Sequence, residues 1–449
     1  MPLPSSPWRT LVRGRRDGQE WEQRMSEATQ QGAAGEDPVV IVGAGLAGAR
    51  AAEAVRDGFG GRVVLVGEEV AAPYIRPPLS KEYLAGTADR DSVDVHPLGW
   101  YAEQAIERIA GHRAAVLDRG AHRLTLDDGR SLRYSRLLLA TGASPRPFPG
   151  PGASLPGVHY LRSVDDSSRL RTALAEGGRR VVIVGSGWIG LEVAATAKGY
   201  GNDVIVLGRG TVPLESAIGA ELGGVFDRLH RDHGVHLGND TAVVELEGEI
   251  RSGGTRVTGV RLSDRTLVRA DLVVVGIGAT PNTQLALGSG LEVDDGIAVS
   301  ATFATSDPDV FAVGDVANVY HPRLGHGLRV EHWANADTAG AAAGRAVLGD
   351  TTGYDAIPYF YTDQFDLSME YSGFGELASG AELVFRGDRA TREFVAFWLR
   401  DGQVVAGMNV NVWDVNETVQ RLIRSGVRVD PKRLADENIA LGDLLTGSE

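Results

Sequence analysis

The chain has 449 residues, of which 43% are hydrophobic and 23% are charged, a composition that predicts a globular protein of two or three domains. Its formal net charge of -14 argues against binding to nucleic acid or to an anionic membrane, so we expect neither as a partner. The absence of cysteine excludes disulfides, thiolate metal sites and a redox-active dithiol, and we expect no metal site. No apolar run approaches the roughly 18 residues that span a bilayer, which predicts a cytoplasmic protein.

The first 37 residues predict a disordered tail, because they are rich in Arg, Gly and Gln and have no helical or strand period. The sequence "RGRR", Arg13 to Arg16, could begin a twin-arginine export signal, but the apolar segment of such a signal does not follow. Met25 is a second candidate start of the chain.

A strand, a glycine-rich turn and a helix are predicted next. The β-branched run Val39 to Val42 precedes Gly43, Gly45 and Gly48, which open an Ala-rich segment. In a dinucleotide-binding turn the first glycine permits the bend, the second admits a pyrophosphate, and the third lets helix and strand pack closely. A second strand ends at Glu68, whose carboxylate can accept hydrogen bonds from ribose hydroxyls. The alternative is a glycine-rich turn followed by an acidic loop.

The same pattern recurs from Val181 to Gly210, with Gly185, Gly187 and Gly190 in the turn. Two such turns predict two dinucleotides, usually a tightly held flavin and an exchanging nicotinamide. The second copy ends in Arg209 where the first ends in Glu68. Because a guanidinium can bind a 2'-phosphate, we expect NADPH to be accepted well. The alternative is an Arg209 side chain in solvent and an enzyme that uses NADH.

Four further segments are distinctive: "PYIRPPLSK" (73–81), "LLLATGASPRP" (137–147), "TSDPDVFAVGDVA" (305–317) and "VEHWANADTAG" (330–340). With the two turns, they make the chain from Val39 onward resemble the FAD-dependent NAD(P)H reductases of the glutathione-reductase structural class. Within that class it is most similar to ferredoxin reductases of the putidaredoxin reductase and dioxygenase reductase type. The resemblance implies FAD, and NADPH or NADH, as cofactors.

The resemblance also implies which residues form the site. Besides the two turns, Glu68 and Arg209, it assigns contacts with the cofactors to Arg76, Lys81, Ala114, Thr141, Gly142, Ile189, Gly278, Gly314, Asp315, Glu331, Trp333 and Tyr361. Trp333 is as compatible with core packing as with a flavin contact. Tyr361 stands where relatives commonly carry Trp, in "FYTDQ" in place of "FWSDQ".

The fold class implied is α/β, with two Rossmann-like dinucleotide-binding domains and an α+β C-terminal domain. Residues 38–147 and 271–348 are expected to bind FAD, and the inserted residues 148–270 are expected to bind NAD(P). Residues 349–449 alternate strand-like runs with a predicted helix from Asn416 to Ser425.

Lys81 and Glu192 resemble an ion pair beside the flavin, where a cation would favour the anionic reduced ring. The alternative for Glu192 is an acidic residue in the first turn of a helix that only interacts favourably with the helix macrodipole. Without cysteine, disulfide reduction and thiol-dependent peroxidase or oxidase chemistry are excluded, which leaves single-electron delivery to a ferredoxin that serves a cytochrome P450 or an oxygenase. Two alternatives are an NAD(P)H oxidase or quinone-type reductase, and a non-catalytic redox sensor similar to apoptosis-inducing factor.

Ferredoxins are typically acidic, so a local basic surface is a candidate for docking. The C-terminal domain offers Arg421, Arg424, Arg428, Lys432 and Arg433, although these residues are equally compatible with a solvated helix face.

Overall fold

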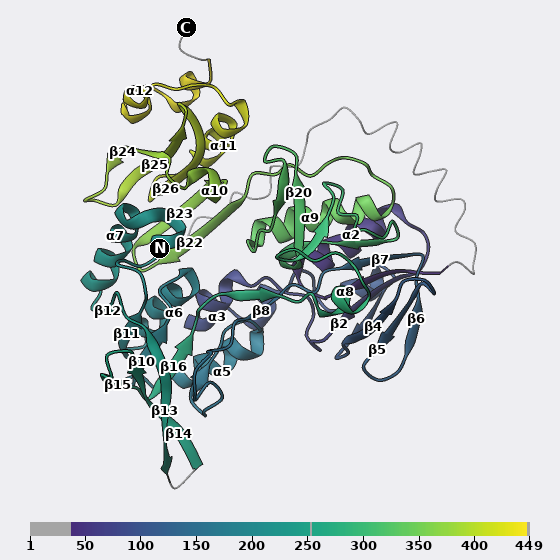
Figure 1. Cartoon of the computed structure of the whole chain (residues 1–449), viewed down its shortest axis with the longest axis horizontal. Coiled ribbons are helices and arrows are strands. Elements are labelled where there is room, and N and C mark those ends of the chain that lie inside the picture. The colour runs from purple at the N-terminus through teal and green to yellow at the C-terminus, as the bar shows by residue number, and fades with distance from the viewer. Residues whose placement is uncertain (1–36, 252–253, 447–449) are drawn as a thin grey trace.

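The computed structural model describes residues 37–251 and 254–446 of the chain. Figure 1 shows three units: one that contains β2 (Val63–Gly67) and β7 (Arg136–Leu139), a second built around β10 (Arg180–Val184) and β11 (Asp203–Leu207), and a third formed by the C-terminal residues from β22 (Tyr359–Gln364) onward. The expected tail at residues 1–37 lies, except for Asp37, outside the described residues.

The first unit has a five-stranded parallel sheet, and its first strand is the predicted Val39–Val42. In spatial order the strands are β19 (Val310–Ala312), β7 (Arg136–Leu139), β1 (Val39–Val42), β2 (Val63–Gly67) and β3 (Ile106–Ala110). Strand order therefore reverses between β1 and β7, and such a reversal opens a crevice at the carboxyl ends of the strands. Helices α2 (Leu46–Gly58) and α9 (Trp333–Val347) pack against one another beside this sheet.

The second unit repeats the arrangement with another parallel sheet. Its strands, in spatial order, are β12 (His236–Gly238), β11 (Asp203–Leu207), β10 (Arg180–Val184), β16 (Leu272–Val275) and β9 (Val158–His159). Three helices belong to this unit, α5 (Val164–Leu174), α6 (Trp188–Gly199) and α7 (Glu215–Asp232).

The pairing of β16 corrects the expected domain division. The sequence predicts that residues from 271 onward belong to the first unit, but Leu272–Val275 pairs with β10 in the second sheet. A parallel sheet in a βαβ fold is buried on both faces, so a run such as "LVVV" has the same apolar pattern in either sheet. The chain passes between the units at the antiparallel pair β8 (Ala143–Pro145) and β17 (Ala279–Pro281).

Smaller elements complete the first two units. They are the antiparallel sheets β4 (Ala114–Asp118), β5 (Arg123–Leu126) and β6 (Ser131–Arg133); β13 (Val243–Arg251), β14 (Gly254–Leu262) and β15 (Leu267–Arg269); and the mixed sheet β18 (Ile297–Val299), β20 (Ala317–His321) and β21 (His326–Leu328). The short helices are η1 (Pro77–Ser80), α3 (Glu82–Ala85), η2 (Arg90–Val93), α4 (Trp100–Glu103), α8 (Gln284–Gly288) and η3 (Gly314–Val316).

The third unit is an antiparallel sheet with helices. Its strands, in spatial order, are β22 (Tyr359–Gln364), β23 (Leu367–Gly373), β26 (Gln403–Val410), β25 (Glu393–Arg400) and β24 (Glu382–Asp388). Helix α11 (Asn416–Ser425) confirms the predicted helix; it buries Val419, Leu422 and Ile423 on one face and ends at Gly426 in a left-handed conformation. The other helices are α10 (Gly375–Ala378), α12 (Pro431–Ala435) and η4 (Leu441–Thr446).

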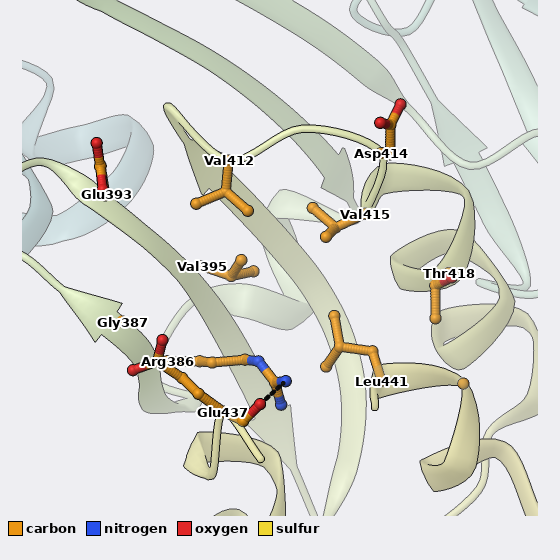
Figure 2. A pocket seen from close by; sticks show the side chains of 11 residues that line it. Arg386, Gly387, Glu393, Val395, Val412, Asp414, Val415, Thr418, Glu437 and Leu441 are labelled. Carbon is orange, nitrogen blue, oxygen red and sulfur yellow. Dashed lines mark hydrogen bonds between the residues drawn. The ribbon is translucent and has the colours of Figure 1, made fainter. Parts of the chain in front are cut away.

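One arginine fastens the C-terminal segment to this sheet. The Arg386 guanidinium, on β24, donates to the carbonyl oxygens of Asp436, Glu437 and Ile439 at 2.9, 3.2 and 2.7 Å. Figure 2 shows its hydrogen bond to Glu437, with Leu441 of η4 nearby. These three bonds hold the C-terminal segment against β24.

Candidate active site

A cavity of about 1030 Å³ lies where the three units meet. Its wall combines the carboxyl ends of β1, β2 and β7, the start of α6, the start of α9, and strand β22. The structure brings together fifteen of the residues predicted for the site: Gly43, Gly45, Glu68, Arg76, Lys81, Ala114, Thr141, Gly142, Ile189, Glu192, Gly314, Asp315, Glu331, Trp333 and Tyr361.

The other predicted residues are not among those that line the cavity. Gly48 is buried in the first turn of α2. Gly185, Gly187 and Gly190 form the second turn, between β10 and α6, and Gly278 precedes β17. Arg209 follows β11. The second turn thus contributes to the cavity through the first residues of α6, including Ile189 and Glu192.

Both turns need their third glycine for close packing. A Cβ atom at Gly48 would lie 1.9 Å from the Gly43 oxygen, and one at Gly190 would lie 2.2 Å from the Gly185 oxygen. In contrast, a Cβ atom at Gly187 would meet nothing within 4 Å, so the space in front of this glycine is open. That space is where a pyrophosphate would approach the backbone at the start of a helix.

At one end of the cavity, Glu68 forms an ion pair with Arg113, with 2.8 Å between Oε1 and Nη2. Both side chains are about two-thirds exposed, at 64% and 68%. Ala114 follows Arg113 in the wall. An exposed carboxylate with one engaged oxygen can still accept hydrogen bonds from the two hydroxyls of a ribose.

Several buried donors in cavity-lining residues have no partner among the described residues. They are Arg76 Nε, Arg162 Nε and Trp333 Nε1; the ring nitrogen Nδ1 of His332 is also unpartnered. An unsatisfied buried polar group costs about 1–3 kcal/mol, so a wall with several of them is built for a polar ligand. Desolvation, together with neighbouring Arg162, lowers the pKa of Arg76. The arrangement fits a dinucleotide, whose phosphates are anionic.

Asp315, at the start of η3, has a partner that the sequence did not predict. Its Oδ2 accepts a hydrogen bond from Arg162 Nη2 at 2.7 Å, and only 13% of the Asp315 side chain is exposed. Arg162 lies in no recognisable motif, and only the folding of the chain brings it close to Asp315. A hydroxyl of a ligand would therefore share the Asp315 carboxylate with Arg162.

Lys81 and Glu192 form the predicted ion pair. Lys81 Nζ lies 2.9 Å from Glu192 Oε1, and the side chains are 9% and 6% exposed. The ammonium group also lies 5.4 Å from the centre of the Tyr361 ring. Glu192 is therefore engaged by a buried cation from another unit, which the macrodipole alternative does not require. Burying an ion pair costs desolvation, and such pairs are typical of functional sites.

The segment around Trp333 is a wall of the cavity. Glu331 is exposed and accepts a hydrogen bond from Arg329. Between Glu331 and Trp333 lies His332, a cavity residue that the sequence did not single out. Burial lowers the pKa of His332 to about 4, so its ring is neutral at pH 7. Its ring lies 4.7 Å from that of Phe360.

Arg209 is exposed, and the structure gives it no ion pair with another described residue. The preceding Gly208 is fixed by packing, since a Cβ atom there would lie 2.2 Å from Ser186 Oγ, inside the second turn. An acidic side chain at position 208 would collide with Ser186. The end of β11 therefore presents a free guanidinium and no carboxylate from position 208.

The basic residues proposed for docking line no part of the cavity. Arg421 and Arg424 are on α11, and Lys432 and Arg433 are on α12. Helix α12 lies against β24, at the sheet edge opposite to β22 (Figure 1). Their role in docking stays a prediction. Within residues 37–251 and 254–446, no helix has the length and apolar character that crossing a membrane requires.

Comparison with known proteins agrees with this site. The family described as pyridine nucleotide-disulphide oxidoreductase matches residues 37–340, and the reductase C-terminal family matches residues 359–445. The chain is 39% identical to the ferredoxin--NAD(+) reductase component of an anthranilate 1,2-dioxygenase system from Burkholderia cepacia, over 91% of this chain and 99% of that protein. It is 35% identical to putidaredoxin reductase from Pseudomonas putida, over 92% and 98%.

Solved structures are similar over the same length. The ferredoxin reductase for the CYP199A2 system from Rhodopseudomonas palustris superimposes with a TM-score of 0.86 at 35% identity, covering 91% of this chain and all of that one. Putidaredoxin reductase in its covalent complex with putidaredoxin gives a TM-score of 0.86 at 34% identity, covering 92% and 99%. The chain belongs to the pyridine nucleotide-disulphide oxidoreductase family, in the group that carries the reductase C-terminal domain.

Proposed function

We propose that this protein is an FAD-dependent reductase that passes electrons from NAD(P)H to a ferredoxin serving a cytochrome P450 or an oxygenase. The buried Lys81–Glu192 pair, in a cavity shared by two dinucleotide turns, carries the proposal. Relatives named as ferredoxin reductases, aligned over nearly the whole chain, support it. The proposal places the protein in the cytoplasm, where reduced nicotinamide coenzymes are regenerated.

In this proposal the first unit holds FAD. Gly43, Gly45 and Gly48 would admit its pyrophosphate, Glu68 would accept hydrogen bonds from its adenosine ribose, and Asp315 would hold the chain that leads to the ring. Arg76 would contribute positive charge to the cavity wall. When bound, FAD accepts a hydride and donates single electrons. We assign residues 38–147 and 276–348 to this unit.

The second unit would hold the nicotinamide coenzyme, and we assign residues 148–275 to it. Its turn, from Gly185 to Gly190, faces open space at Gly187, and Ile189 and Glu192 continue this surface into the cavity. Lys81 would hold positive charge beside the flavin ring, and Glu192 would keep that ammonium group in place. A cation fixed there favours the reduced, anionic ring without reorganisation during the reaction.

The absence of cysteine directs the electrons to an external acceptor. The whole chain contains none, so it cannot carry the dithiol that a disulfide reductase of this family needs. Residues 349–449, which we assign to a C-terminal domain, place Phe360 and Tyr361 of β22 in the cavity wall. The Tyr361 ring lies beside the ion pair, with its centre 5.4 Å from Lys81 Nζ, where it would shape the route by which electrons leave.

The test is turnover with and without a [2Fe-2S] ferredoxin. Purified protein is expected to be yellow, to bind about one FAD per chain without a covalent bond, and to reduce the ferredoxin with NADPH or NADH. Rapid coenzyme oxidation that is indifferent to ferredoxin would favour an oxidase or quinone-type reductase. Slow flavin reduction with a long-lived charge-transfer band would instead indicate a redox sensor. Folded protein that stays colourless after FAD is added would reject the proposal.

A further inference from the structure

The Glu192 carboxylate is the point at which the three units meet. Its Oε1 accepts hydrogen bonds from Lys81 Nζ, at 2.9 Å, and from Thr362 Oγ1, at 2.6 Å. Its Oε2 accepts one from Ser80 Oγ. Lys81 and Ser80 come from the first unit, Glu192 is on α6 of the second, and Thr362 is on β22 of the third. The C-terminal domain thus supplies one of three donors to this carboxylate.

Thr362 is also the end of a buried chain of hydrogen bonds. Gln364 Nε2 donates to Thr362 Oγ1 at 3.1 Å, and Gln364 Oε1 lies 2.9 Å from His230 Nε2, on α7. Thr362 and Gln364 are 1% exposed and His230 is 0% exposed. Residues two apart on a strand face the same side, which places both β22 side chains toward the second unit.

The direction of donation along this chain is determined by its chemistry. The Gln364 amide donates to Thr362, so its oxygen must accept from His230, whose Nε2 then carries the proton. His230 Nδ1 has no partner among the described residues, as a ring protonated only at Nε2 allows. Since Thr362 Oγ1 accepts from Gln364, its own hydrogen goes to Glu192. In each of these three hydrogen bonds, the donor therefore lies on the His230 side and the acceptor on the Glu192 side.

We propose that Thr362 is a positioning residue for hydride transfer, which orients the Glu192 carboxylate so that Lys81 is held at the cavity wall. This inference rests on the proposed function. The threonine contacts Glu192 and not the cavity, so it acts through the ion pair. A carboxylate with only Lys81 and Ser80 as donors could turn away from the geometry in which the ammonium group faces the flavin, and small displacements at such sites have large effects on rate.

The test compares Thr362→Val, which removes the hydroxyl and keeps the shape, with Thr362→Ser, which keeps the hydroxyl. Stopped-flow flavin reduction by NADPH or NADH is expected to slow on the order of tenfold in the valine variant, because a hydrogen bond to a charged group is lost. The serine variant should stay within about twofold of wild type. Thr391→Val, at an exposed hairpin of the same domain, is the matched control and should leave the rate unchanged.

A second readout does not depend on the nicotinamide. The midpoint potential of the bound flavin, measured by titration with dithionite, should become more negative in Thr362→Val and not in Thr362→Ser, because a displaced Lys81 stabilises the reduced ring less. An unchanged rate and potential in the valine variant, or equal losses with serine and valine, would overturn the role of the hydroxyl. If neither NADPH nor NADH reduces the wild-type flavin, the proposed function is wrong. The midpoint potential of the flavin then still tests whether the Thr362 hydroxyl holds Lys81 in place.

The hydrogen-bonded chain has its own test. Nitrogen-15 spectra of histidine-labelled protein, with the His230→Gln variant to assign the signal, should show His230 as the neutral tautomer protonated at Nε2 at pH 7. In Gln364→Leu this signature should change, because the acceptor for the ring proton is gone. A neutral His230 ring protonated at Nδ1 alone, which leaves Nε2 as an acceptor, would refute the direction of donation.

Discussion

The two dinucleotide turns share their backbone design and differ in the residues that come after their second strands. In both turns, the third glycine packs against the carbonyl oxygen of the first glycine. A Cβ atom added to the third glycine would lie 1.9 Å from that oxygen in the first turn and 2.2 Å from it in the second. After β2 the chain presents Glu68, paired with Arg113, whereas after β11 it presents Arg209 without an ion pair among the described residues. Under the proposed function, the shared part would bind a dinucleotide, and the different part would select which dinucleotide binds.

The difference extends to how the turns meet the cavity. Gly43 and Gly45 of the first turn line the cavity directly, but the second turn reaches it through Ile189 and Glu192 of α6. A ligand of the first turn would therefore be enclosed, and a ligand of the second would lie nearer to solvent. This contrast matches a cofactor that stays bound and a coenzyme that exchanges.

The largest effect is expected from substitution of the third glycine in each turn, which should affect the two turns differently. Gly48→Ala and Gly190→Ala both force a Cβ atom onto a carbonyl oxygen, and each should destabilise its own unit by about 3 kcal/mol. Gly48→Ala should lose FAD on purification. Gly190→Ala should stay yellow but be reduced poorly by NADPH or NADH. Absorbance spectra and stopped-flow reduction measure the two outcomes, and equal loss of FAD in both variants would contradict the assignment of the turns.

The next effect is at the point where the two ligands would meet. Lys81→Met should slow flavin reduction by a factor that corresponds to about 2–4 kcal/mol, because it removes the cation and leaves the buried Glu192 unpaired. Stopped-flow measurement gives the rate, with Lys432→Met, far from the cavity on α12, as the control. A rate like that of wild type would mean that the pair is structural only.

The local part of the fold could be predicted from the sequence. Strands β1 and β2, both glycine turns and helix α11 follow from apolar periodicity and turn chemistry, which act over a few residues. The sheet that β16 joins could not be predicted, because the same buried run pairs equally well in either parallel sheet. Pairing partners are chosen by the whole topology.

The site shows the same division. Lys81 and Glu192 could be paired in advance only because the surrounding motifs resemble those of a known family. Nothing in the local sequence marks Arg162 or Thr362 as a partner of a cavity residue, because each partner is distant in the sequence: Arg162 bonds Asp315, 153 residues later, and Thr362 bonds Glu192, 170 residues earlier. Such contacts depend on how the units pack, which no short pattern encodes.

A smaller effect tests the ends of the turns. Arg209→Ala should lower the ratio of kcat/KM for NADPH to that for NADH by about ten- to a hundredfold, because one charge-assisted contact with the 2'-phosphate is lost. Glu68→Ala should leave this ratio unchanged and weaken FAD retention. Steady-state kinetics with both coenzymes measures the ratio, and a wild type that strongly prefers NADH would show that Arg209 does not bind the 2'-phosphate.

The smallest expected effect is the pH dependence of the stability that two buried histidines, one in each of the first two units, contribute. Burial lowers the pKa of His230 to about 4, below its ordinary value of about 6.5. A depressed pKa means that the unfolded chain binds more protons between these values, so the stability that neutral His230 contributes is present at pH 7 and falls as the pH drops, by about 2 kcal/mol at pH 5. His332 has the same depressed pKa but lines the cavity. In melting experiments the difference in Tm between wild type and His230→Gln should therefore shrink from pH 7 to pH 5 whether or not FAD is added, whereas the corresponding difference for His332→Gln should depend on FAD. A His230 contribution that is constant across this pH range would mean that the folded and unfolded chains bind the same number of protons at this ring, so that burial does not lower its pKa.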